Sequence, residues 1–231
     1  MGCEKSKPRD ATLNPLLLSD QITFNEVNED PKYRPIIGTK EVRILSIDGG
    51  GIRGVLPAVI LREIQKKTGK HPTDLFDLFA GTSIGGILSI GMNVPDENNK
   101  PRFDCSDLVN FFVEDGKNIF KKSWSKCWES KGGLCDEKYE SGGIETFLEK
   151  NFKDKKMSES IKPVVVTSFE VERYKPMNFK SWDDSQQFLS RFAARSTSAA
   201  PTFFELARGE HLSSGIFNML GNRYLAKFNV L

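Results

Sequence analysis

Apolar residues are patterned as short runs and helical stripes that alternate along the first part of the chain. A β-branched run over 42–47 predicts a buried strand. The next segment, 55–67, carries apolar residues at positions 55, 56, 59, 60 and 64 and ends at Thr68-Gly69, which predicts an amphipathic helix. A second strand is predicted over 75–80, with a helix continuing from residue 86. Two strand–turn–helix units in succession predict a parallel sheet covered by helices.

The remainder continues this α/β pattern. The apolar run 163–169 predicts another inner strand, and 177–182 a short antiparallel or edge neighbour. Further helices are predicted over 108–120, over 143–152, and from Gln186 to about Ser198 with Ser185 as its cap and Phe188, Leu189 and Phe192 facing inward. Residues 1–40 are polar and contain several prolines, which predicts a flexible leader before one domain over 41–231.

Two glycine-rich turns follow the first two predicted strands. Asp48 precedes the first turn, whose residues are Gly49, Gly50, Gly51, Ile52, Arg53 and Gly54. The second turn, Gly81-Thr82-Ser83-Ile84-Gly85, has the Gly-x-Ser-x-Gly form of a nucleophile elbow, in which a tight strand-to-helix turn exposes a serine hydroxyl. Acyl transfer needs such a nucleophile together with backbone donors for the oxyanion. The pair of turns therefore predicts a serine acyl hydrolase.

The first turn also fits another function. Spacing of the form G-x-G-x-x-G after a strand is typical of dinucleotide-binding sites, which carry an acidic residue about twenty residues later, at the end of a second strand. Asp74 has roughly the right separation, but it precedes the second predicted strand. This position disfavours the dinucleotide interpretation.

Composition narrows the class of protein. With 231 residues, a formal charge of +2 and 38% hydrophobic residues, the chain predicts one globular domain and gives no reason to expect nucleic acid. The four cysteines lack C-x-x-C spacing and only two histidines are present, so we expect reduced thiols, no metal site and no cofactor. Neither a membrane-spanning stretch nor a signal-peptide core is visible, which predicts a cytoplasmic protein.

The first seven residues qualify that location. They match the M-G-x-x-x-[ST] pattern for myristoylation at Gly2, with Cys3 placed for palmitoylation and two lysines beside it. Stable attachment to a bilayer needs a second chain or basic residues besides one acyl group, and both are present. The alternatives are peripheral membrane attachment and an unmodified start.

Three blocks resemble the patatin-like phospholipases: the Asp-Gly-Gly-Gly-Ile-Arg-Gly turn, the elbow 76–86, and the block 194–204, in the same order as in that family. The resemblance implies a three-layer α/β/α fold with a mainly parallel central sheet, and release of fatty acids from membrane glycerolipids. It also implies Ser83 as nucleophile, an oxyanion hole on Gly50 and Gly51, and a Ser-Asp dyad that needs neither histidine nor metal.

The sequence departs from the family where the dyad aspartate is expected. No aspartate follows Asp184, and Ser213 occupies the corresponding turn. Glu205 and Glu210 are the only later acids. We therefore expect a domain incomplete at its C-terminus with impaired hydrolysis, and the alternative is a catalytically inactive lipid-binding or membrane-associated protein.

A second enzyme class has the order serine, acid, histidine. An α/β-hydrolase triad would use Ser83, then Asp183 or Asp184, then His211. No recognisable signature surrounds His211, and His71, which precedes the elbow beside Pro72, is interpreted as a surface turn residue.

Basic and aromatic residues interleave from Phe111 to Tyr139. They include Phe112, Lys117, Phe120, Lys121, Lys122, Trp124, Lys126, Trp128 and Lys131. This composition fits a lid that meets anionic lipid headgroups. It fits equally a helix with an aromatic core stripe and a solvated lysine face, which is the simpler interpretation.

Overall fold

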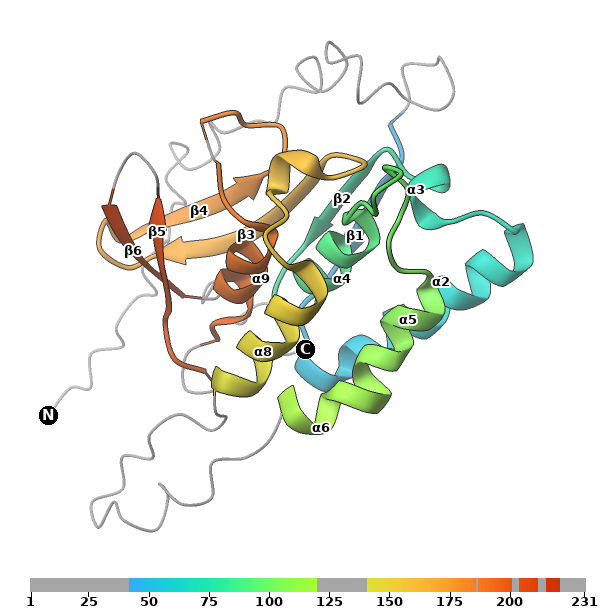
Figure 1. The fold of residues 1–231 in the computed structure, drawn as a ribbon, viewed down its shortest axis with the longest axis horizontal. Coiled ribbons are helices and arrows are strands. Elements are labelled where there is room, and N and C mark those ends of the chain that lie inside the picture. Colours follow the sequence, from blue (N-terminus) through green and yellow to red (C-terminus); the bar gives the residue numbers. More distant parts are fainter. Residues whose placement is uncertain (1–41, 120–140, 186, 201–203, 212–214, 221–231) are drawn as a thin grey trace, which may run out of the picture.

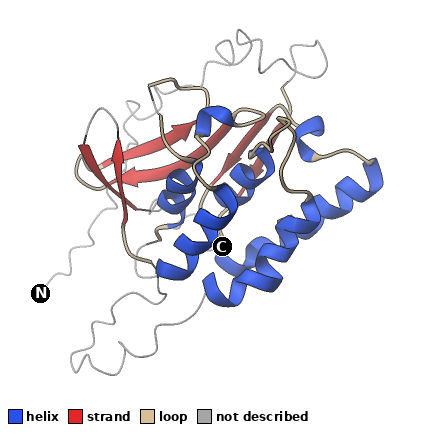
Figure 2. Ribbon diagram, viewed as in Figure 1, coloured by secondary structure: helices blue, strands red, loops and turns tan. Residues whose placement is uncertain are grey.

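A computed structural model describes residues 42–119, 141–185, 187–200, 204–211 and 215–220 (Figure 1). The predicted leader and its acylation pattern at Gly2 and Cys3 lie outside the described residues, as does most of the basic and aromatic segment up to Tyr139. Figure 2 separates the helices from the strands of this part of the chain.

One mixed sheet runs through the described part of the molecule, in the order β1-β2-β3-β6-β5, with β4 also paired to β3. Its strands are β1 (Ile44–Ile47), β2 (Leu78–Gly81), β3 (Val164–Glu170), β4 (Lys175–Lys180), β5 (Ala207–His211) and β6 (Gly215–Leu220). The strands β1, β2 and β3 are parallel, as predicted, and β4 is the predicted antiparallel neighbour. The β5–β6 hairpin was not predicted from the sequence.

The helices connect and cover these strands. They are η3 (Gly51–Gly54), α2 (Val55–Thr68), α3 (Pro72–Leu75), α4 (Ile84–Asn93), α5 (Cys105–Asn110), η4 (Phe111–Asp115), α6 (Gly116–Ile119), α8 (Ser141–Phe152), η5 (Met157–Glu159) and α9 (Ser190–Ser198). Helices α4 and α9 pack against each other and against β3, while α2 lies beside α5 (Figure 1). Parallel strands joined through helices give the predicted α/β architecture.

Helix α4 is the centre of the core. All ten of its residues are buried, including Leu88 and Ile90. A helix that is apolar on every side is stable only inside a protein. The residue that begins this helix, Ser83, is therefore attached to one of the most constrained elements of the molecule.

Two predicted boundaries and one predicted helix face differ from the structure. The strand predicted from residue 75 begins only at Leu78, because Pro72 and the cap residue His71 start the short helix α3. Helix α9 begins at Ser190, four residues after the predicted start: Ser185 bonds to Asp183, and Leu189 forms a β-bridge with Lys156. On α2, Leu56 and Ile60 are exposed, and Ala58 and Leu61 are the residues that enter the core.

A buried carboxylate fixes the start of β1 against β2. Asp77 is 4% exposed, and one of its oxygens accepts hydrogen bonds from the backbone N–H and the Nε of Arg43 at 3.0 and 3.3 Å. The Asp77 N–H in turn donates to the Arg43 carbonyl at 2.8 Å. These contacts set the register that later brings the two glycine turns together.

Removing this carboxylate is expected to destabilise the fold. Asp77→Ala leaves a partly buried guanidinium and a backbone N–H without their acceptor, which costs about 2 to 4 kcal/mol of unfolding free energy. Urea denaturation measures the loss. Asp154→Ala is the matched control, since Asp154 is 86% exposed and pairs with Arg191 at the surface. A loss for Asp77→Ala no larger than that of the control contradicts this role.

His71 is a helix cap rather than a free surface residue. Its Nδ1 accepts from the Thr73 N–H at 3.2 Å, and its Nε2 lies 3.1 Å from the Phe103 carbonyl, so the neutral ring with a proton on Nε2 fits both partners. Burial lowers the pKa of His71 below its ordinary value of 6.5, and this effect outweighs the opposing influence of the Phe103 carbonyl, Asp74 and Asp104.

The lowered pKa of His71 predicts the sign of a pH effect. The neutral ring is the form favoured in the folded state, so its contribution is complete above about pH 6.5 and is lost as the pH falls toward the lower folded pKa. Unfolding free energies measured between about pH 7.5 and 5.5 should fall more steeply for the native chain than for His71→Asn, which keeps a capping side chain. Equal slopes for the two proteins contradict the assignment.

Candidate functional site

Both glycine turns lie at the same end of the parallel strands. Ile47, the last residue of β1, is in register with Gly81, the last residue of β2. The Thr82 N–H extends this ladder by donating to the Ile47 carbonyl at 3.3 Å. The carboxyl ends of parallel strands are the usual location of ligand sites in open α/β sheets.

The second turn has the backbone of an elbow. Ser83 has φ of 55° and ψ of −124°, a left-handed conformation that is uncommon for a residue with a side chain, and it is the N-cap of α4. A Cβ on Gly81 would overlap the backbone of Gly85, and a Cβ on Gly85 would overlap the carbonyl oxygen of Ile47. The two predicted elbow glycines are therefore required by close backbone packing, which holds Ser83 partly exposed at the turn.

The first turn contacts the second directly. A Cβ built on Gly49 would lie 3.1 Å from the Ser83 Cβ and 3.2 Å from the Thr82 carbonyl oxygen, so the glycine allows the two loops to approach closely. Gly50 is exposed and Gly51 has φ of 56°. Because the first N–H groups of a helix have no partner within that helix, the start of η3 offers backbone donors beside the elbow.

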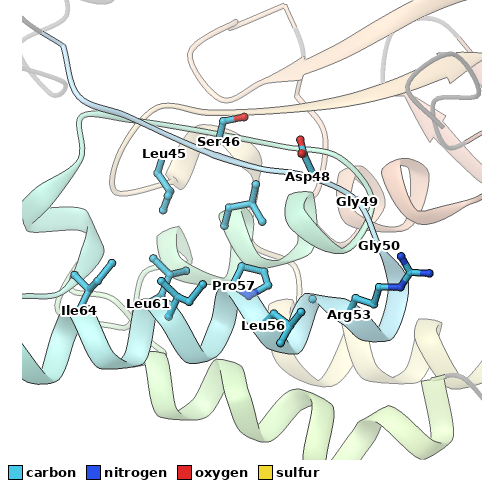
Figure 3. Close-up of a pocket in the computed structure, with 13 residues that line it drawn as sticks. Leu45, Ser46, Asp48, Gly49, Gly50, Arg53, Leu56, Pro57, Leu61 and Ile64 are labelled. Carbon is cyan, nitrogen blue, oxygen red and sulfur yellow. The ribbon is translucent and has the colours of Figure 1, made fainter. Parts of the chain in front are cut away.

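The last two residues of the first turn, Arg53 and Gly54, have different surroundings from its first three glycines. Gly54 is buried, and a Cβ there would overlap the side chains of Ile84 and Phe112, so this glycine serves the packing of η3 on α4. Arg53 is exposed and its side chain extends on the Gly50 side of η3 (Figure 3). Of the predicted oxyanion-loop residues, Gly49 contacts the elbow directly, and the role of Gly50 and Gly51 as oxyanion donors stays a prediction.

Two threonines support the elbow from other elements. The Ser83 N–H donates to Thr197 Oγ1 on α9 at 2.8 Å, and Thr82 Oγ1 lies 2.7 Å from Thr167 Oγ1 on β3. A Cβ on Gly86 would lie 2.8 Å from the Thr197 methyl group. In the sequence, Thr197 is noticeable only as a member of the block 194–204, and Thr167 is not noticeable at all. The reason is that no local sequence pattern indicates which group a threonine hydroxyl will bond to.

The acidic residues considered as catalytic partners of Ser83 are Asp183, Asp184, Glu205 and Glu210. The segment after β4 returns to the start of β3, where the Ser181 N–H donates to the Val164 carbonyl. Asp183 and Asp184 therefore follow a residue at the amino end of β3, whereas Ser83 follows the carboxyl end of β2, and this placement disfavours the α/β-hydrolase triad. Glu205 is exposed and its backbone carbonyl accepts from Arg195. Ser213 and the side chains of Glu210 and His211 lie outside the described part of the chain.

Asp74, the acidic residue that the dinucleotide interpretation would need, has a structural role instead. The Asp74 carboxylate accepts from the His71 N–H at 3.2 Å and completes a capping box, which leaves the dinucleotide interpretation without its acidic residue. Within the described residues, no cluster of histidine, cysteine and acidic side chains could hold a metal ion. None of the described helices has both the length and the apolar character needed to cross a membrane.

The described part of the basic and aromatic segment, 111–119, is helical, and two of its residues are buried in the core. Helix α5, η4 and α6 continue from Cys105 to Ile119, and Phe112 and Ile119 are buried. Burial raises the pKa of the Cys105 thiol to about 12, so this residue is not a thiolate nucleophile at neutral pH. Trp124, Trp128 and the lysines around them lie beyond the described residues.

A groove of about 380 Å³ begins at the first glycine turn. It runs between β1 and α2, and its lining includes Asp48, Gly49, Gly50 and Arg53 at one end (Figure 3). The rest of its lining is mostly apolar: Leu45, Ile47, Leu56, Pro57, Ile60, Leu61 and Ile64.

The sequence is similar to those of several plant proteins named as patatins or patatin-like proteins. Patatin-like protein 2 of Oryza sativa subsp. indica is 35% identical over 71% of this chain and 44% of its own length. Patatin-like protein 2 of Arabidopsis thaliana is 34% identical over 76% of this chain and 46% of its own, and Patatin-T5 of Solanum tuberosum 32% identical over 71% and 43%. The matched region thus spans less than half the length of these relatives.

A solved structure and a family model complete the comparison. VipD from Legionella pneumophila matches 79% of this chain and 46% of its own with 12% identity and a TM-score of 0.38, which is too low to support an argument. The model described as patatin-like phospholipase matches residues 45–224, well over half of the chain, and its fold is the predicted three-layer α/β/α class. The chain belongs to the patatin-like phospholipase family.

Proposed function

We propose that this chain hydrolyses carboxylic esters of lipids, with Ser83 as the nucleophile. The supporting observation is the contact between the two glycine turns, in which Gly49 packs directly on the Ser83 Cβ. Family membership supports lipid acyl hydrolysis as the class of reaction. Membrane glycerolipids are the proposed substrates, and acylation at Gly2 and Cys3 would bring a cytoplasmic protein to their surface.

The proposed reaction has two steps. Ser83 Oγ bonds to the ester carbonyl carbon as its proton passes to a base, and the oxyanion accepts hydrogen bonds from the N–H groups of Gly50 and Gly51. Collapse of this intermediate breaks the bond to the alcohol, which leaves with a proton. Water then attacks the acyl-serine and releases the fatty acid, regenerating Ser83.

The weak element is the base. Ser213 occupies the sequence position where the family resemblance implies an aspartate, and a hydroxyl does not accept a proton near neutral pH. Loss of one member of a catalytic unit lowers kcat by about 10⁴ to 10⁶, while oxyanion donors and binding retain about 10³ to 10⁴ over water. We therefore propose slow but Ser83-dependent turnover.

A Ser83→Ala variant tests the nucleophile. The native chain should hydrolyse p-nitrophenyl butyrate slowly, and Ser83→Ala should reduce the rate to that of buffer. Ser106→Ala is the control, because Ser106 is exposed on α5 and its side chain takes no part in the site. Identical rates for the native chain and Ser83→Ala would sink the proposal.

A second candidate function follows from the same absence of an aspartate after Asp184. Without any base, the chain would bind lipid esters and leave them intact. Phospholipid vesicles separate the candidates: binding with no release of fatty acid above the Ser83→Ala background favours a lipid-binding protein, whereas Ser83-dependent release favours the hydrolase.

Thr197 is proposed as a positioning residue for the elbow. Its hydroxyl accepts the Ser83 N–H and its methyl group packs on Gly86, so it fixes the backbone from which the nucleophile projects. Thr197→Val keeps the shape but removes the acceptor. Since misplacement by about 1 Å can cost a factor of about 100, we expect kcat to fall by about 10- to 100-fold with KM little changed.

The conservative variant distinguishes this role from a general loss of stability. Thr197→Ser keeps the acceptor and should retain kcat within about threefold, although it loses the methyl contact on Gly86. Equal loss of kcat in Thr197→Val and Thr197→Ser would instead assign the effect to packing.

A further inference from the structure

One side of η3 and α2 carries exposed apolar side chains. Ile52, Leu56 and Ile60 are spaced four residues apart and are 51%, 63% and 60% exposed. Gln65 lies about half a turn around the helix from Leu56 and Ile60, and its side chain accepts a hydrogen bond from the Cys105 N–H at the start of α5 at 2.9 Å. The exposed apolar residues are therefore directed away from the neighbouring helix. Large exposed apolar patches mark interaction surfaces.

Basic residues extend this apolar side at both ends. Arg53, Ile60 and Lys67 are spaced seven residues apart, which places them on the same side of a helix, and Lys70 follows the C-cap of α2. Arg53, Lys67 and Lys70 are exposed, and none of them pairs with an acidic group among the described residues. These three cations and the three apolar residues Ile52, Leu56 and Ile60 are called the outward face of α2.

The charge of this segment is strongly unbalanced. Residues 51–70 contain five basic residues and one acidic residue, a net charge of +4, although the whole chain carries only +2. The acidic residue, Glu63, already pairs with Arg62 and Lys66, each at 3.2 Å. Lysine is depleted in protein–protein interfaces, whereas exposed apolar side chains combined with lysine and arginine are typical of helices that lie on anionic bilayers. The outward face is therefore complementary to a negatively charged lipid surface.

We infer that the outward face of α2 docks on the surface of an anionic phospholipid bilayer. Ile52, Leu56 and Ile60 enter the interface, and the three cations lie beside the headgroups. The inference rests on the proposed function for its choice of a lipid surface, because membrane glycerolipids are the proposed substrates. One acyl chain alone gives only marginal membrane attachment, so this face would supply a second contact besides the acylation pattern at Gly2 and Cys3.

Vesicle binding by the unacylated chain carrying Ser83→Ala tests the inference without hydrolysis or a lipid anchor. Co-sedimentation with vesicles of phosphatidylcholine and phosphatidylserine should give a Kd that rises with added salt. Adding Leu56→Ser/Ile60→Ser should raise this Kd at least about tenfold, because apolar burial is lost. Adding Lys67→Gln/Lys70→Gln should raise it about 25-fold, at about fivefold for each cation beside an anionic surface. Binding to phosphatidylcholine alone should not respond to the lysine substitutions.

Matched substitutions elsewhere on the surface are the controls. Tyr174→Ser changes a side chain that is 76% exposed in the turn between β3 and β4. Lys150→Gln/Lys153→Gln removes two exposed cations at the end of α8. Both controls should bind the anionic vesicles as the parent chain does.

The outcomes separate this inference from the proposed hydrolysis. If turnover of soluble p-nitrophenyl butyrate depends on Ser83 but vesicle binding is absent, or is unchanged in either outward-face variant, the inference falls and the hydrolase proposal stands. If both outward-face variants lose binding and no ester is turned over, the inference stands and the hydrolase proposal falls. Concentration-dependent self-association that Leu56→Ser/Ile60→Ser abolishes also overturns the inference, because the face is then a contact between copies of the chain.

Discussion

The arrangement of the site depends on a backbone contact between α4 and the ends of β1 and β2. Gly85 lies so close to the Ile47 carbonyl that a Cβ would overlap it, and a Cβ on Gly81 would likewise overlap the backbone of Gly85. This contact allows a fully buried helix to begin directly at the strand ends, which forces Ser83 into its left-handed conformation. The strain at Ser83 is maintained by the packing of α4 on every side and by the acceptor that Thr197 offers to its N–H.

The second requirement is register. The carboxylate of Asp77 binds Arg43 at the start of β1, and from there the ladder runs to the pairing of Ile47 with Gly81. A shift of one residue would separate the two turns and reverse the faces of β1. The ion pair therefore supports, from the opposite end of the strands, the register on which the contact between Gly49 and Ser83 depends. The same strand pairing that forms the sheet therefore also brings the two glycine turns together.

Much of this could be predicted from the sequence, because local patterns carried it. Short apolar runs indicated the parallel strands, and the glycines marked the turns that the structure brings into contact. The hydroxyls of Thr167 and Thr197 were missed because their partners lie 85 and 114 residues away in the sequence. The β5–β6 hairpin and the helix capped by His71 were also missed, although both are formed by neighbouring residues. The outward row of Leu56 and Ile60 was missed because periodicity identifies an apolar helix face without saying what covers it.

The proposed mechanism requires that the N–H groups of the first turn face the oxyanion formed at Ser83. A crystal structure of the chain after reaction with a fluorophosphonate tests it most directly, since the adduct mimics the tetrahedral intermediate. We expect phosphorus bonded to Ser83 Oγ and the phosphoryl oxygen about 2.7 to 3.1 Å from the backbone nitrogens of Gly50 and Gly51. An adduct on another residue, or a phosphoryl oxygen directed away from this turn, would contradict it.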